Sequence, residues 1–192
     1  RIFIVNHPPK VPMLYAYGDD FPSFLSGFKP LSAYPFLPSL AHLERCWLDA
    51  FHAADLATLD PAIFAEVGES HLGELVFTPH PATALIESKF AIASLMARCR
   101  EDLPLDDLEL GVPETALVTR PDAEVEVRTL LGGGAVFFQY LLAGNTLGTA
   151  AAAATNSDPK FDLPAAIAAL IKSGAFTSAE LKPAQNIKGA AK

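Results

Sequence analysis

Apolar side chains recur at helical spacing between residues 36 and 55, a pattern that predicts an amphipathic helix. The predicted apolar face carries Phe36, Leu37, Leu40, Leu43, Trp47, Leu48, Phe51 and Ala54. The opposite face carries His42, Arg45, Asp49 and His52. Glu44 interrupts the apolar face, where a carboxylate needs an arginine or a backbone donor as its partner. A tie between helices is favoured over catalysis as the role of Glu44.

The segments before and after this helix show shorter patterns. Prolines divide residues 1–35 into turns and one brief helix, predicted over residues 21–27. The following elements are predicted next: a helix over residues 62–67 capped by Asp60, a strand over residues 72–78, a short strand near Leu85, and a helix from about Phe90 to Arg100. The acidic residues 101–111 predict a solvated loop.

Polar and apolar residues alternate in the second of two extended segments that follow, residues 115–119 and 124–130. In that segment Val125, Val127 and Thr129 fall on one face, and Glu124, Glu126 and Arg128 on the other. The sequence Arg120-Pro121-Asp122-Ala123 between the segments suits a hairpin turn.

Three short helices are predicted after this hairpin. A glycine run at residues 132–134 is interpreted as a strand-to-helix connector, since no Lys-Ser/Thr pair follows that would favour a phosphate loop. The predicted helices cover residues 135–143, residues 147–154 behind Thr146, and residues 163–173 between Asp162 and Gly174. Two strands, a glycine turn and three helices are the order of a winged-helix module.

The predicted fold class is therefore α+β, in two domains and a tail. Residues 1–67 form the C-terminal part of a helical domain. Residues 68–178 form a winged-helix-like α+β domain with a small antiparallel sheet. Residues 179–192 form a flexible tail. Because residue 1 is not Met, we expect that earlier sequence of the helical domain is missing from this numbering.

The charge of the chain disfavours nucleic acid as a partner. Formal net charge is -8, with 22 acidic against 14 basic residues. The helix at 146–155, where a winged-helix protein would read base edges, offers only Gly, Ala, Leu and Thr, followed by Asn156 at its end. Between Gly111 and Ser178 four basic residues face six acidic ones. DNA binding stays open only for the whole protein, through sequence that precedes residue 1.

Strand addition is the remaining use of such a module, because an edge strand beside an apolar helix can accept an extended peptide. The predicted peptide-binding residues are Val125, Glu126, Val127, Arg128 and Thr129 on the strand, and Ile167, Leu170 and Ile171 on the last helix. From the residues alone, the alternative that both elements simply pack on the core stays open.

Known catalytic motifs were not found, and we expect no enzymatic activity, cofactor or metal. The five histidines occur in no metal-ligand spacing, and no G-x-S-x-G sequence occurs. Cys46 and Cys99 are interpreted as buried thiols in a reducing compartment. No apolar run approaches the roughly 20 residues that span a bilayer. We therefore expect a cytoplasmic protein without a membrane partner.

Three groups of residues resemble a bacterial family known as HvfC/BufC-like, which carries a DNA-binding domain label. These groups are His7-Pro8-Pro9 with Leu14-Tyr15, Tyr17-Gly18 and Phe21-Pro22-Ser23-Phe24-Leu25; the run from Tyr34 to Glu44 with Trp47 and Ala53-Ala54-Asp55; and His80-Pro81-Ala82 with Leu85-Ile86. The turn Ala143-Gly144-Asn145-Thr146-Leu147 and the ending Ser173-Gly174-Ala175-Phe176 resemble the PqqD-like peptide-recognition element.

The resemblance implies a partner protein of a multinuclear non-haem iron oxidative enzyme, which presents a ribosomally made precursor peptide for modification (RiPP biosynthesis). On this hypothesis the protein is a non-catalytic adaptor, and Trp47 and Arg45 are its predicted partner-docking residues. One alternative is a DNA-binding transcriptional regulator. Another is a structural subunit whose helical face around Trp47 packs on a partner.

Overall fold

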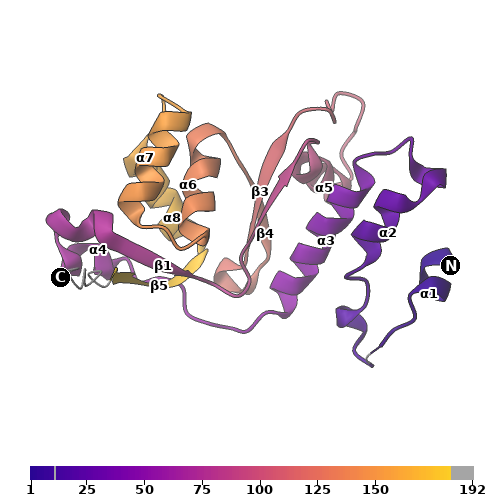
Figure 1. The fold of residues 1–192 in the computed structure, drawn as a ribbon, viewed down its shortest axis with the longest axis horizontal. Coiled ribbons are helices and arrows are strands. Elements are labelled where there is room, and N and C mark those ends of the chain that lie inside the picture. The colour runs from indigo at the N-terminus through magenta and orange to yellow at the C-terminus, as the bar shows by residue number, and fades with distance from the viewer. Residues whose placement is uncertain (11, 183–192) are drawn as a thin grey trace, which may run out of the picture.

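The computed structural model describes residues 1–10 and 12–182. The α+β class predicted from the sequence is confirmed: helices surround small antiparallel sheets, one of two strands and one of three in the described residues. The strands of the larger sheet run through the middle of Figure 1, with helices α3 and α5 on one side and α6, α7 and α8 on the other. Within the described residues, no helix has the length and apolarity needed to cross a membrane.

The N-terminal part is a chain of short helices held together by aromatic rings. Its elements are α1 (Ile2–Asn6), a 3₁₀ turn (Leu14–Ala16), α2 (Phe21–Gly27), a 3₁₀ turn (Lys29–Leu31) and α3 (Leu37–His52). The Phe3 ring lies 5.0 Å from that of Phe21 and 5.3 Å from that of Phe24, between ring centroids. These contacts join α1 to α2, which in turn packs against α3.

The three-stranded sheet has the order β2-β3-β4 and separates two hydrophobic clusters. Its strands are β2 (Ala84–Ser88), β3 (Glu114–Thr119) and β4 (Glu126–Leu130). On one face lies the α3 cluster, in which Leu43 and Ala50 of α3 pack with β2, β3 and α5 (Ile92–Arg100). Ala116 and Val118 point into it, whereas Leu117 points to the other face. Alternate residues of β3 are thus buried on opposite sides, as the pleat requires.

The second cluster, here called the aromatic cluster, fills the other side of the molecule. Its rings are Phe77, Phe137, Phe138 and Phe176. The elements around it are α4 (Ala62–Val67), a 3₁₀ turn (Glu69–Glu74), β1 (Leu75–Pro79), α6 (Gly132–Leu142), α7 (Leu147–Ser157), α8 (Leu163–Ser173) and β5 (Phe176–Leu181). β1 and β5 pair antiparallel as the two-stranded sheet.

Several local predictions are confirmed by capping contacts. Asp162 Oδ1 accepts a hydrogen bond from Ala165 N at 3.1 Å and begins α8, and Thr146 Oγ1 accepts from Thr149 N at 3.3 Å and begins α7. Gly174 has φ +64° and ends α8, in the left-handed conformation that glycine adopts without strain. The order of β3, β4 and three helices also matches the prediction, but the glycine run is the first turn of α6, which begins at Gly132, and not a connector before it.

Two predicted segments need correction at the two-stranded sheet. The strand predicted over 72–78 begins only at Leu75, because 69–74 form a 3₁₀ turn. The tail predicted over 179–192 is wrong for 179–181, which complete β5 and pair with β1, so that Leu181 lies opposite Leu75. The pairing partner lies about a hundred residues away, so local pattern could not reveal it. Residues 183–192 lie outside the described part of the chain.

The predicted division at residue 67 does not coincide with a division between the cores. The α3 cluster joins Leu43 to Ile86 and Ala116, and the aromatic cluster joins Ile63 and Phe64 to later elements. Both clusters therefore contain side chains from before and after residue 67.

Candidate functional site

Strand β4, predicted to bind a peptide, is an edge strand. Among the described residues it pairs only with β3, and its residues are half-buried except Thr129, which is exposed. The predicted alternation is confirmed by the packing, since Val125 and Val127 contact the α3 cluster. Glu126 and Arg128 form an ion pair with each other, two residues apart on the same strand and therefore on the same face.

The register shows which backbone groups of β4 face outward. In an antiparallel pair, alternate residues either exchange both backbone hydrogen bonds with the facing residue or point both groups away from it. At the next position of this register Leu131 would face Glu114, but the Leu131 N–H donates no hydrogen bond to the Glu114 backbone oxygen in the described structure. Leu131 and Glu114 are therefore not a bonded pair, and neither is every second pair from there along the strand. The bonded pairs are therefore Thr115–Leu130, Leu117–Arg128 and Thr119–Glu126. It follows that Val127 and Thr129 turn their N–H and C=O groups toward the free edge.

This free edge is not closed by another part of the described chain. Within residues 1–10 and 12–182, the backbone groups of Val127 and Thr129 take part in no hydrogen bond outside the sheet. Unpaired edge groups of this kind are what an added strand uses. Leu131, which directly follows β4, is 79% exposed and extends this edge with an apolar side chain.

Helix α8, the second predicted wall of the peptide groove, packs elsewhere. Leu170 is buried in the aromatic cluster, and Ile167 and Ile171 are partly buried against the same cluster. Val125 and Val127 of the strand segment instead pack on the α3 cluster, across the sheet. The structure therefore does not bring the two predicted walls together into one groove. Whether any of these residues binds a peptide stays a prediction.

The surface that a DNA-binding winged helix would use has no basic side chain on α7. Leu147, Ala150 and Ala154 are buried, and the exposed positions near its end are Thr155, Asn156 and Ser157. The charge argument from the sequence therefore applies to the folded module as well.

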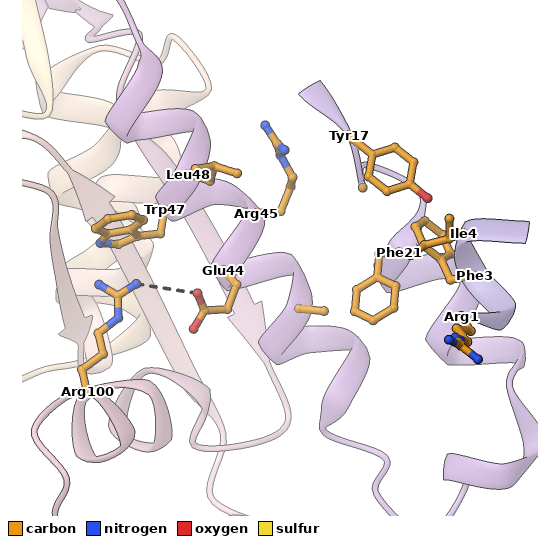
Figure 2. Close-up of a pocket in the computed structure, with 12 residues that line it drawn as sticks. Arg1, Phe3, Ile4, Tyr17, Phe21, Glu44, Arg45, Trp47, Leu48 and Arg100 are labelled. Carbon is orange, nitrogen blue, oxygen red and sulfur yellow. Dashed lines mark ion pairs between the residues drawn. The ribbon is translucent and has the colours of Figure 1, made fainter. Parts of the chain in front are cut away.

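Trp47 and Arg45, the predicted docking residues, both line a pocket between α3 and the N-terminal segment (Figure 2). The pocket has a volume of about 570 Å³. Its lining residues are Arg1, Phe3, Ile4, Tyr17, Gly18, Phe21, Ala41, Glu44, Arg45, Trp47, Leu48 and Arg100. They come from α1, the 3₁₀ turn region, α2, α3 and α5, so the pocket depends on tertiary packing.

Arg45 holds the N-terminal segment onto α3. Its guanidinium pairs with Asp49 one turn along α3 and with Asp19 at 3.2 Å, and it donates a hydrogen bond to the backbone oxygen of Tyr15. The hydrogen bond to Asp49 is the main cause that raises the pKa of Arg45. Only 13% of the side chain is exposed. Arg45 is therefore engaged within the molecule, and a docking role for it stays a prediction.

Glu44, for which the sequence called for an arginine or a backbone donor, has an arginine partner, although its side chain is exposed rather than buried. Arg100 Nη2 of α5 lies 3.6 Å from Glu44 Oε2, as the dashed line in Figure 2 marks. The same guanidinium lies 4.3 Å from the ring centroid of Trp47, within the range of a cation–π contact. Sequence reasoning did not single out Arg100, because only the packing of α5 on α3 brings it to Glu44.

The remaining polar groups offer no assembled catalytic centre among the residues that the structure describes. His80 is buried, accepts from Ala82 N at Nδ1 and lies 3.1 Å from Leu56 O at Nε2, so both ring nitrogens are used in holding a loop. Burial, followed by the charge of Asp49, raises the pKa of the Cys46 thiol. Cys99 is exposed and Cys46 is only partly buried, which corrects the prediction of two buried thiols. No group of three potential metal ligands lies together in the described part.

Comparison with known proteins neither supports nor contradicts the family resemblance drawn from the sequence. The chain matches no protein-family model. It matches no curated protein.

Proposed function

We propose that this protein is a non-catalytic adaptor that binds an extended, ribosomally made precursor peptide by strand addition along β4. The outward backbone groups of Val127 and Thr129, unpaired in the described structure, are the observation that carries the proposal. Presentation of the peptide to a multinuclear non-haem iron enzyme, and docking through Trp47 and Arg45, rest on the family resemblance alone.

The strand geometry limits how such a peptide can bind. An added strand would exchange hydrogen bonds with Val127 and Thr129, and its side chains would alternate between the two faces of the sheet. On one face its neighbours would be the side chains of Val127 and Thr129 beside the α3 cluster. On the other they would be the Glu126–Arg128 ion pair, which favours polar peptide positions there. Affinity would come mainly from the backbone and selectivity from these alternating neighbours.

Hydrogen exchange tests the edge directly. A peptide selected from a displayed random library against the full chain would serve as the probe. We expect the Val127 and Thr129 amides to exchange fast in the free protein and to become protected in the complex. The amides of Glu126, Arg128 and Leu130 are paired with β3 and should be protected in both states. Unchanged exchange at Val127 and Thr129 would rule out strand addition at β4.

A matched pair of proline variants tests the same edge by affinity. Val127→Pro removes one outward N–H and leaves the bonds to β3, so we expect a normal fold and at least about tenfold weaker binding of the selected peptide. Arg128→Pro removes a bond to Leu117 and should instead lower the stability of the sheet. Equal peptide affinity of Val127→Pro and the unchanged protein would contradict the proposal.

A DNA-binding regulator is the alternative function, and its signature is different. Duplex affinity would fall steeply as salt rises, because each phosphate contact releases counterions. Titration of a random-sequence duplex at low and at physiological salt would separate the two functions.

A further inference from the structure

The pocket between α3 and the N-terminal segment has the size and lining of a small-molecule site. Its volume of about 570 Å³ lies within the roughly 300–1,000 Å³ of known ligand pockets. Most of its wall is aromatic or aliphatic, from Phe3, Phe21, Trp47 and Leu48 among others. In Figure 2 the rings of Phe3, Phe21 and Tyr17 stand on one side of the opening, and Trp47, Glu44 and Arg100 on the other.

The charges around this pocket are opposite to those of the chain as a whole. Arg1, Arg45 and Arg100 line it with a single acidic residue, Glu44, whereas the protein carries a formal net charge of -8. Arg45 is already neutralised by Asp19 and Asp49.

Arg100 has unused hydrogen-bonding capacity beside Trp47. Its separation of 3.6 Å from Glu44 is too long for a hydrogen bond, and its guanidinium donates none to the described residues. Its side chain is 40% exposed beside the pocket, and Trp47 supports one face of the guanidinium. A planar guanidinium presents two parallel N–H groups to a carboxylate, so a carboxylate that enters the pocket finds donors ready.

We infer that this pocket binds a small apolar molecule ending in a carboxylate, with Arg100 as the partner of the carboxylate. The apolar body lies over Trp47 and Leu48 and reaches the rings of Phe3 and Phe21. Glu44 competes for Arg100 and keeps the affinity for the anion moderate. This binding site is distinct from the β4 edge and does not depend on peptide binding.

Decanoate, below its micelle-forming concentration, is the probe that tests the inference on the full chain. Trp47 is the single tryptophan, so its fluorescence reports the pocket without a label. We expect a saturable change with decanoate and at least about tenfold weaker binding of decyltrimethylammonium, which has the same apolar chain and the opposite charge. Butyrate, which has the carboxylate with little apolar body, should also bind more weakly. Equal binding of the two decyl compounds, or no saturable binding of decanoate, would overturn the inference.

Two arginine variants on one helix distinguish Arg100 from general charge. Arg100→Gln should weaken decanoate at least about tenfold, measured by calorimetry because the variant also alters the surroundings of Trp47. Arg98→Gln removes the same charge from α5, but Arg98 pairs with Asp107 and does not line the pocket, so affinity should stay within about twofold. Circular dichroism would verify that both variants fold. Equal losses in the two variants would overturn the role of Arg100, and Val127→Pro should leave decanoate binding unchanged.

Discussion

The aromatic cluster and the α3 cluster face each other across one sheet but are held together differently. Buried phenylalanine rings fill the aromatic cluster, and Phe137 and Phe176 have at most 1% of their surface exposed. The buried core of the α3 cluster has Leu43, Ile86, Ile92, Met96 and Val118 with four alanines, and its aromatic side chains, Trp47 and Phe90, are only partly buried. Apolar area alone therefore stabilises the α3 cluster less.

Charged side chains tie the helix ends around the α3 cluster. Arg120, from the β3–β4 connection, donates hydrogen bonds to the backbone oxygens of Ala53 and Ala54 at the end of α3. Glu114 of β3 accepts from Ala93 N and Ser94 N at the start of α5. Both candidate sites, the β4 edge and the pocket beside Trp47, lie at the margin of this same cluster. Both candidate surfaces thus lie beside the cluster that has fewer buried aromatic rings.

Truncation of one central side chain in each cluster should give the largest losses of stability and test the contrast between the clusters directly. Phe137→Ala should lower the free energy of unfolding by about 3–5 kcal/mol, because the surrounding rings cannot close the cavity. Leu43→Ala in the α3 cluster should cost about 2–4 kcal/mol, since a smaller side chain is removed among small neighbours. Urea denaturation of both variants checks the order, and a larger loss for Leu43→Ala would contradict the contrast between the clusters.

Removal of the Arg120 side chain should have the next largest effect. Arg120→Ala leaves the carbonyl oxygens at the end of α3 without their donor, and only 9% of this side chain is exposed, so we expect a loss of about 2 kcal/mol. Arg120→Lys keeps the charge but not the guanidinium fork, and should recover only part of the loss. Thermal denaturation measures both, and equal stability of Arg120→Lys and the unchanged protein would show that charge alone suffices.

A carboxylate cap on the aromatic side should give the smallest effect, seen as a change in how stability depends on pH. Asp158 accepts hydrogen bonds from Lys160 N at 3.0 Å and Gly133 N at 3.3 Å, and these bonds lower its pKa. A lowered folded pKa stabilises the fold above the unfolded pKa, near 3.9, and the contribution is lost as pH falls through the folded pKa.

Asp158→Asn should therefore reduce stability slightly at neutral pH and flatten the decline of stability below about pH 4. Asp107 also has a lowered pKa, through its hydrogen bond with Arg98. The stability of the variant should therefore still decline somewhat with falling pH over the same acidic range. Denaturation midpoints measured from pH 2 to 7 check this, and an unaltered slope in the variant would exclude Asp158 as a contributor.

Local sequence was sufficient for elements whose boundaries are fixed by side chains within a few residues. The helix over residues 21–27 and the caps Thr146, Asp162 and Gly174 were predicted as found. The alternation of Val125, Val127 and Thr129 gave the orientation of β4. It failed for β5, whose strand conformation depends on a partner that lies far away in the chain.

The sequence by itself determined most of the helices, the β3–β4 hairpin and the low positive charge, because each follows from periodicity, capping or composition. Only the tertiary structure decided that Arg100 is the partner of Glu44, that α8 lies on the other side of the sheet from Val127, and that the Val127 and Thr129 backbones face outward. These relations join elements distant in the chain, and they are fixed by how the two clusters pack against one sheet.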